Sequence, residues 1–161
     1  MTIAVGEGLP DTDFFVLNNG RPQKISSREI FAGRKVVLFG VPGAFTPTCS
    51  LNHLPGFLEQ HDAILEKGVD EIVVVAVNDA NVMDAWAEAT GGKGRIRYVS
   101  DGNAEFATAT GLDQDSSGVG RGTRMKRFAM IVEDGVVRTL DVEDNSGEAV
   151  KSSAARILEQ L

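Results

Sequence analysis

Two short apolar runs, Val36 to Val41 and Ile72 to Val77, dominate the hydrophobic pattern of the chain. Both are rich in valine and flanked by charged residues or glycine, which predicts strands buried on both faces. Between them, apolar side chains recur at helical spacing from Leu54 to Gly68, where a glycine ends the run. The pattern therefore predicts a strand, helix, strand unit with parallel strands.

Alternation of helix and strand continues after this unit. A helix is expected from Asn81 to Thr90, because apolar positions share one face and two glycines follow. A short strand is expected near Ile96 to Val99, followed by a short helix from Ala104 to Thr110. The polar, glycine-rich stretch from Gln114 to Gly122 is expected to be a loop.

The last third of the chain carries a hairpin signal. Two apolar runs, Arg127 to Val132 and Val136 to Val142, are separated by Asp134-Gly135, a dipeptide that tolerates positive φ in a tight turn. A final helix follows, capped by Ser152 or Ser153. Because parallel and antiparallel pairs are both predicted, the fold class is α/β, with a mixed central sheet flanked by helices.

Composition places the chain among ordinary globular proteins. It has 161 residues, 42% hydrophobic and 24% charged, which suits one domain spanning residues 1–161. A net charge of −7 argues against binding to nucleic acid or to an anionic membrane surface. Neither a signal peptide nor a membrane span is recognisable, so a cytoplasmic location is expected.

The single cysteine, Cys49, is the main candidate for chemistry. Thr46 followed by Pro47 is typical of a helix start and puts Cys49 in the first turn. There, free backbone N–H groups and the helix dipole favour a thiolate. Cysteine usually packs as a small buried hydrophobe, but the polar neighbours Thr48 and Ser50 favour a reactive group.

The residues around this cysteine resemble a known family. Pro42-x-x-x-Thr46-x-x-Cys49 matches the peroxiredoxin signature, and the string from Val41 to Ser50, followed by His53 to Phe57, is similar to the type-five, or atypical two-Cys, branch. Further matches cover nearly the whole chain in the same order: Val77 to Asp79, Ala85-Trp86 and Lys126 to Met130. The resemblance implies a thioredoxin-like fold and a thiol-dependent peroxidase.

The same resemblance assigns roles to four residues. Cys49 would be the peroxidatic cysteine, which attacks a hydroperoxide and becomes a sulfenic acid. Thr46 would orient the peroxide, and Pro42 would shield the sulfenic acid from water. The essential arginine falls on Arg127, where it would stabilise the thiolate and the developing oxyanion. Arg124 is a second candidate, because several cations crowd this region and the sequence does not show which one points inward.

His53 stands four residues after Cys49, so the two could share a helix face. That spacing raises a Cys–His hydrolase or half of a metal site as alternatives. A zinc site needs three or four ligands, whereas His61 is the only other histidine, and Pro55 is expected to interrupt the helix. We therefore expect neither a metal nor an organic cofactor, and a structural role for His53 at the rim of the site.

Recycling must differ from that of two-Cys relatives. Animal members of the branch carry a resolving cysteine near the start of the C-terminal helix, where this chain has Val150 to Ala154 and no thiol. An external thiol must then reduce the sulfenic acid, either glutathione with glutaredoxin or thioredoxin. A binding or sensing protein that is oxidised once at Cys49 is the alternative from another functional class.

Two further expectations concern surfaces. The family resemblance implies a homodimer that pairs through loops near the active site, with Pro42 to Thr48 and Val82 to Trp86 as the candidate segments. Phe45 and Phe57 indicate an apolar rim around the substrate pocket.

Overall fold

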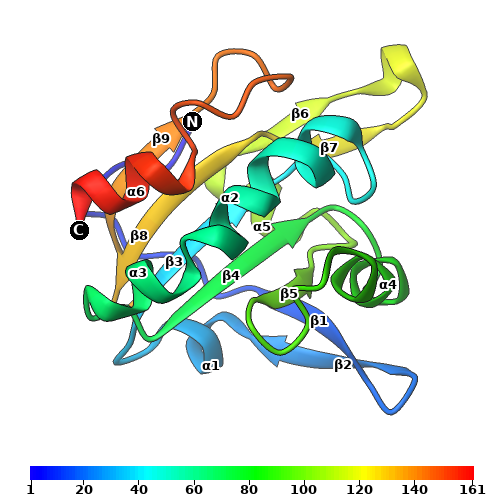
Figure 1. Cartoon of the computed structure of the whole chain (residues 1–161). Coiled ribbons are helices and arrows are strands. Elements are labelled where there is room, and N and C mark those ends of the chain that lie inside the picture. Colours follow the sequence, from blue (N-terminus) through cyan, green and yellow to red (C-terminus); the bar gives the residue numbers. More distant parts are fainter.

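A computed structural model of the chain describes residues 1–161, which fold around a seven-stranded mixed sheet (Figure 1). The strands run in the order β2-β1-β5-β4-β3-β8-β9 across the sheet. Their bounds are β1 Asp13–Asn18, β2 Arg21–Ser26, β3 Lys35–Gly40, β4 Glu71–Ala76, β5 Arg97–Ser100, β8 Phe128–Glu133 and β9 Val136–Val142.

The two valine-rich runs form the central strands, as predicted. β3 pairs in parallel with β4, and β4 in parallel with β5. On its other side β3 pairs antiparallel with β8, which forms the expected hairpin with β9. Asp134 and Gly135 occupy the turn with φ of 49° and 75°, the conformation for which this dipeptide is suited. The sheet is therefore mixed, as the pattern indicated.

Helices cover both faces of the sheet (Figure 1). Their bounds are α1 Ser27–Phe31, α2 Leu54–Glu59, α3 His61–Glu66, α4 Ala80–Thr90, α5 Glu105–Thr110 and α6 Ala154–Gln160. α2, α3, α4 and α6 pack on one face, and α1 and α5 pack on the other. No helix has the length and apolar character that crossing a membrane requires.

Alternate residues of β3 feed two separate hydrophobic clusters, because successive strand side chains point to opposite faces. Val37 and Phe39 belong to the cluster under α2, α3, α4 and α6, whereas Val36 and Leu38 belong to the cluster under α1 and α5. All four are fully buried. A strand buried on both faces reads as a continuous apolar run, which is why the sequence pattern located it.

The helix expected from Leu54 to Gly68 is in fact two helices, α2 and α3. The break lies at Gln60, whose φ of −94° and ψ of 6° depart from helical values. Contacts with a distant segment stabilise it: the guanidinium of Arg95 donates to the Leu58 carbonyl at 2.9 Å, and the imidazole of His61 lies 2.9 Å from the Arg95 carbonyl. The periodicity of apolar residues does not register such a break.

The stretch expected to be a loop from Gln114 to Gly122 carries more structure than predicted. A short strand β6, Asp113–Asp115, pairs antiparallel with β7, Thr123–Met125, and a 3₁₀ turn η2, Ser117–Val119, lies between them. Backbone hydrogen bonds rather than apolar side chains hold these two short strands together. The sequence therefore shows no alternation of apolar and polar residues that would predict them. Met125, which is fully buried, attaches its base to the core.

Candidate active site

Cys49 lies on the helical segment that follows the central strand β3. The chain leaves β3 at Gly40, and helical structure begins at Pro47, close to the start predicted from the sequence. Cys49 opens a π-helical turn, η1 Cys49–His53, in which the N–H of Leu54 donates to the Cys49 carbonyl. Such turns recur at functional sites. Pro55, which has no N–H to donate, is accommodated within α2 and does not end the helix there.

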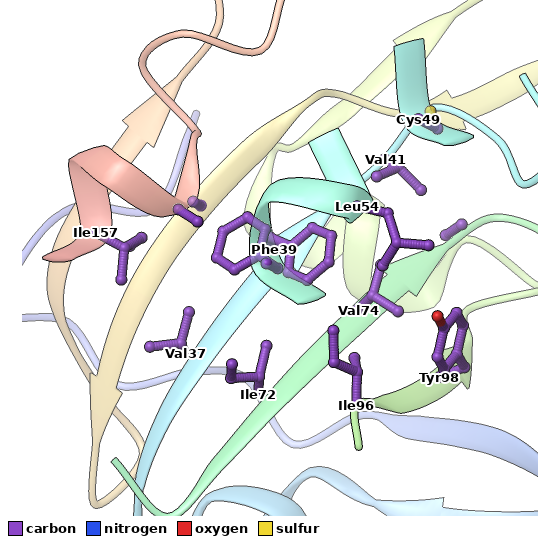
Figure 2. Close-up of a cluster of buried hydrophobic side chains, with 14 of the residues drawn as sticks. Val37, Phe39, Val41, Cys49, Leu54, Ile72, Val74, Ile96, Tyr98 and Ile157 are labelled. Carbon is purple, nitrogen blue, oxygen red and sulfur yellow. The ribbon is translucent and has the colours of Figure 1, made fainter. Parts of the chain in front are cut away.

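The sulfur of Cys49 is buried at the edge of the core. Its side chain is 0% exposed, and Figure 2 shows it beside Val41 and Leu54 at one end of the apolar cluster that continues through Phe39. Packing of this kind alone would suit an inert cysteine. The polar partner on its other side distinguishes it from one.

That partner is Arg127, which immediately precedes β8. Its Nη2 donates a hydrogen bond to the Cys49 sulfur at 3.0 Å, and the residue is only 2% exposed. The other acceptors of the guanidinium are His53 Nδ1 and the Ser146 carbonyl, both at 2.9 Å. Arginine stays protonated in proteins, so among these three acceptors only the sulfur can carry a compensating negative charge. The arrangement places a permanent positive charge directly against the sulfur.

The sequence placed His53 at the rim of the site. In the structure His53 is instead buried beside Arg127. It is 1% exposed; its Nδ1 accepts from Arg127, and its Nε2–H donates to the Ser152 carbonyl at 2.8 Å. Burial, with the charge of Arg127 second, lowers the pKa of His53 to about 3 although the Ser152 bond opposes it. The imidazole is therefore neutral at physiological pH.

This geometry removes the hydrolase alternative for His53. Both ring nitrogens are occupied by partners other than Cys49, so the Cys–His pair of a hydrolase is not formed. No group of three His, Cys, Asp or Glu side chains lies close enough to hold a metal ion. The histidine has a structural role in this site: its Nδ1 accepts a hydrogen bond from Arg127 and so holds one edge of the guanidinium.

Arg124, the second candidate for the essential arginine, is directed elsewhere. Its Nη1 donates to the Val77 carbonyl at 2.9 Å, and its Nε donates to the Arg121 carbonyl at 2.8 Å. Of the two arginines, Arg127 is the one that contacts the cysteine.

A polar cleft of about 270 Å³ opens next to Arg127. Pro42 and Thr46 line it, together with Arg127. The hydroxyl of Thr46 donates to the Gly43 carbonyl at 2.7 Å, so its oxygen remains an acceptor. Apart from two prolines and a glycine, the remaining lining side chains are hydroxyl, amide or guanidinium groups: Thr48, Gln114, Ser116, Arg121 and Ser146.

The prediction that Phe45 and Phe57 form an apolar rim around the substrate pocket is wrong. Phe57 is fully buried and stacks on Phe39 with ring centres 4.0 Å apart. Phe45 is 55% exposed but lines a separate groove with Leu51 and Trp86, which we call the apolar groove. Phe45 also adopts a positive φ of 63°, a conformation rare for a bulky residue and typical of functional loops.

Sequence reasoning did not foresee the part that the segment of residues 143–152 plays here. Glu143 and Ser152 are buried, and Ser146 and Ser152 supply carbonyls to Arg127 and His53. These residues lie between β9 and α6, far along the chain from Cys49. Polar residues in a connecting segment carry no local signal of such a contact.

Comparison with known proteins agrees with the geometry. The redoxin family matches residues 4–158. The chain is 47% identical to "Peroxiredoxin-2E-2, chloroplastic" of Oryza sativa subsp. japonica, covering 99% of this chain and 73% of that protein. It is 44% identical to "Peroxiredoxin-2B" of Arabidopsis thaliana, covering 99% of this chain and 98% of that protein.

Solved structures give the same result. Reduced Prx3 of Vibrio vulnificus in complex with H₂O₂ superposes with a TM-score of 0.93 at 46% identity, covering 99% of each chain. Peroxiredoxin 5 of Alvinella pompejana superposes with a TM-score of 0.87 at 32% identity, covering 98% of this chain and 96% of that one. The mixed sheet between helices is thus the thioredoxin-like fold that the resemblance implied. With its single cysteine beside a buried arginine, the chain belongs to the peroxiredoxins, enzymes that act as thiol peroxidases.

Proposed function

We propose that the chain reduces hydrogen peroxide and organic hydroperoxides through a sulfenic acid on Cys49. The observation that carries the proposal is the 3.0 Å contact between Arg127 Nη2 and the Cys49 sulfur. The thiolate attacks the terminal oxygen of the hydroperoxide, so that an S–O bond forms as the O–O bond breaks. The leaving oxygen takes the electron pair and a proton and departs as water or an alcohol.

Three residues assist that step in this proposal. Arg127 lowers the energy of the thiolate and of the negative charge that develops on the peroxide oxygens, because charge-assisted hydrogen bonds are strong in a buried site. Thr46 orients the hydroperoxide through its hydroxyl, whose oxygen remains available as an acceptor for the hydroperoxide proton. Pro42 lines the cleft without offering an N–H, and shields the sulfenic acid from water.

Regeneration requires an external thiol, because no second cysteine exists to form an internal disulfide. One thiol condenses with the sulfenic acid to give a mixed disulfide and water, and a second thiol displaces Cys49 as the reduced thiol. We propose glutathione with glutaredoxin, or thioredoxin, as the donor. These systems keep thiols reduced in the cytosol, which is the location we propose for antioxidant defence and redox homeostasis.

We also propose that the chain forms a homodimer through the apolar groove. The groove is lined by residues from both segments expected at the interface, Phe45 in one and Trp86 in the other, together with Leu51. Phe45 and Leu51 are 55% and 79% exposed and line the same groove, and exposed apolar side chains that gather in one patch often mark a protein–protein interface. A second copy would bury both. Sedimentation of Leu51→Arg should show a monomer where the unmodified chain is a dimer; equal oligomeric states would contradict the proposal.

The function is tested by peroxide consumption. The unmodified chain and Cys49→Ser are compared with three reductants supplied separately: dithiothreitol, glutathione with glutaredoxin, and thioredoxin with its reductase. Cysteine-dependent turnover with one of them supports the proposal and identifies the donor. Stoichiometric oxidation of Cys49 without turnover under all three would instead favour a sensor.

A further inference from the structure

Arg127 is held from two sides by the segment of residues 143–152. On one side, the backbone N–H of Glu143 donates to the Arg127 carbonyl at 3.0 Å, and the Nε of Arg127 donates to the Ser146 carbonyl at 2.9 Å. On the other side, His53 Nδ1 accepts from Arg127 Nη1 at 2.9 Å, and His53 Nε2 donates to the Ser152 carbonyl at 2.8 Å. The segment therefore reaches the guanidinium both directly and through the histidine.

The side chain of Glu143 holds this segment in shape. It is 8% exposed, and its Oε2 accepts hydrogen bonds from both the backbone N–H and the hydroxyl of Ser152, each at 2.6 Å. Lys151, the residue before Ser152, pairs with Asp144 instead. Burial of a carboxylate is costly unless hydrogen bonds compensate it, so these two bonds strongly favour one arrangement of Ser152. That arrangement directs its carbonyl to His53.

The guanidinium depends on such support because no carboxylate fixes it. Its partners other than the sulfur are a neutral imidazole and a backbone carbonyl. Burial and the adjacent guanidinium lower the pKa of His53 to about 3, which keeps Nδ1 an acceptor. Its ring also packs at a tilt against the stacked rings of Phe39 and Phe57, with ring centres 5.0 and 5.6 Å away. A small rotation of this ring would leave Arg127 free to turn away from the sulfur, because the fork of an arginine is rigid and directional.

We propose that Glu143 is a positioning residue for the chemistry of Cys49. It orients Ser152, Ser152 orients His53, and His53 holds Arg127 in the direction that places Nη2 on the sulfur. The start of the C-terminal helix is thereby coupled to the reactivity of the cysteine. The inference extends the proposed function, but it can be measured on the thiol itself in the absence of peroxide.

The experiment compares Glu143→Ala and Glu143→Gln with the unmodified chain. Alkylation of Cys49 by iodoacetamide is followed as a function of pH, and thermal unfolding is recorded for each variant. We expect Glu143→Ala to slow alkylation at neutral pH by about tenfold, less than the 10²–10³-fold cost of losing a stabilising donor outright. The pH at which the alkylation rate reaches half its maximum should also be higher in Glu143→Ala than in the unmodified chain. Glu143→Gln keeps an acceptor oxygen and should restore most of the rate.

Asp144→Asn is the matched control, because Asp144 is the next residue, has a side chain that is 87% exposed, and pairs only with Lys151. It should alkylate like the unmodified chain. A folded Glu143→Ala with an unchanged alkylation profile would overturn the inference, even if its unfolding temperature fell, since a purely structural role would do no more than that.

Variants at His53 keep the inference testable if Glu143→Ala does not fold. His53→Asn retains an acceptor near the position of Nδ1 and should keep more of the alkylation rate than His53→Gln, which retains only the donor toward Ser152. Equal rates for both variants and the unmodified chain would overturn the proposal. Absence of peroxide consumption in the unmodified chain would contradict the proposed function alone, because the alkylation profiles are obtained without peroxide.

Discussion

The indole N–H of Trp86 donates a 3.0 Å hydrogen bond to the hydroxyl of Ser50, the residue next to Cys49. Trp86 lies on α4, is fully buried and is the only tryptophan of the chain. The bond ties the turn that carries the cysteine to a helix on the same face of the sheet. Since the Cys49 sulfur is 0% exposed, an external thiol can reach a sulfenic acid there only if this turn moves.

Oxidation of Cys49 should therefore change the fluorescence of Trp86. Breaking the bond to Ser50 alters the polarity around the indole, so mixing with peroxide should give a fluorescence change whose rate rises linearly with peroxide concentration. Stopped-flow measurement of the unmodified chain and of Ser50→Ala tests this. A large signal in Cys49→Ser would show that the change does not report on the cysteine.

Replacement of Arg127 by Gln should slow oxidation of Cys49 by about 10²–10³-fold, the cost of removing one stabilising donor from a charged transition state. Arg127→Lys should recover only part of the rate, because an ammonium cannot reproduce the fork that reaches the sulfur, His53 and Ser146 together. Arg124→Gln serves as the comparison, since its guanidinium is bonded to backbone carbonyls elsewhere. A larger loss in Arg124→Gln than in Arg127→Gln would reverse the assignment.

Acidification should destabilise the fold through His53. Its pKa is about 3 in the folded state against 6.5 when unfolded, so between these values the unfolded chain binds the extra proton. The free energy of unfolding should then fall as the pH drops from 6.5 towards 3, by at most about 1.4 kcal/mol per pH unit from this group, with no further loss from it below 3. Urea unfolding measures the free energy of unfolding at each pH for the unmodified chain and for His53→Asn. The unmodified chain should show the steeper dependence on pH between 3 and 6.5, and the difference between the two slopes is the contribution of His53.

The polar cleft should favour a small hydrophilic peroxide. Its lining lacks large apolar side chains, so a bulky apolar hydroperoxide gains little from burial there. We expect hydrogen peroxide to oxidise Cys49 about tenfold faster than cumene hydroperoxide does. Ser116→Leu adds an apolar side chain to the lining of the cleft, so it should reduce the ratio of the oxidation rate with hydrogen peroxide to that with cumene hydroperoxide. Faster oxidation by cumene hydroperoxide in the unmodified chain would contradict this account of the cleft.

Excess peroxide without a thiol should overoxidise the enzyme. With no second cysteine to trap the sulfenic acid, Cys49 should proceed to the sulfinic acid, which thiols do not reverse. Intact mass should show two added oxygens that survive dithiothreitol and are missing from Cys49→Ser. An unmodified mass after prolonged exposure would count against a reactive thiolate.

Local patterns were enough to predict much of the scaffold. Valine-rich runs predicted β3 and β4, Asp134-Gly135 predicted the β8–β9 hairpin, and the Thr46-Pro47 pair predicted a helix start close to Cys49. Each of these features depends on residues adjacent in the chain, whose backbone preferences and burial pattern are local properties. The fold class and the candidate nucleophile followed from them.

Contacts between distant segments decided the rest. The sequence left Arg124 and Arg127 as alternatives, placed His53 at the rim and gave no role to Glu143. Which arginine meets Cys49 depends on where β8 begins in register with β3, and the setting of His53 depends on a carbonyl 99 residues away. By itself the sequence determined the strands β3, β4, β5, β8 and β9, the turn at Asp134-Gly135 and the candidate nucleophile Cys49. Only the tertiary structure decided which charges surround that cysteine, because those interactions join segments that no local pattern connects.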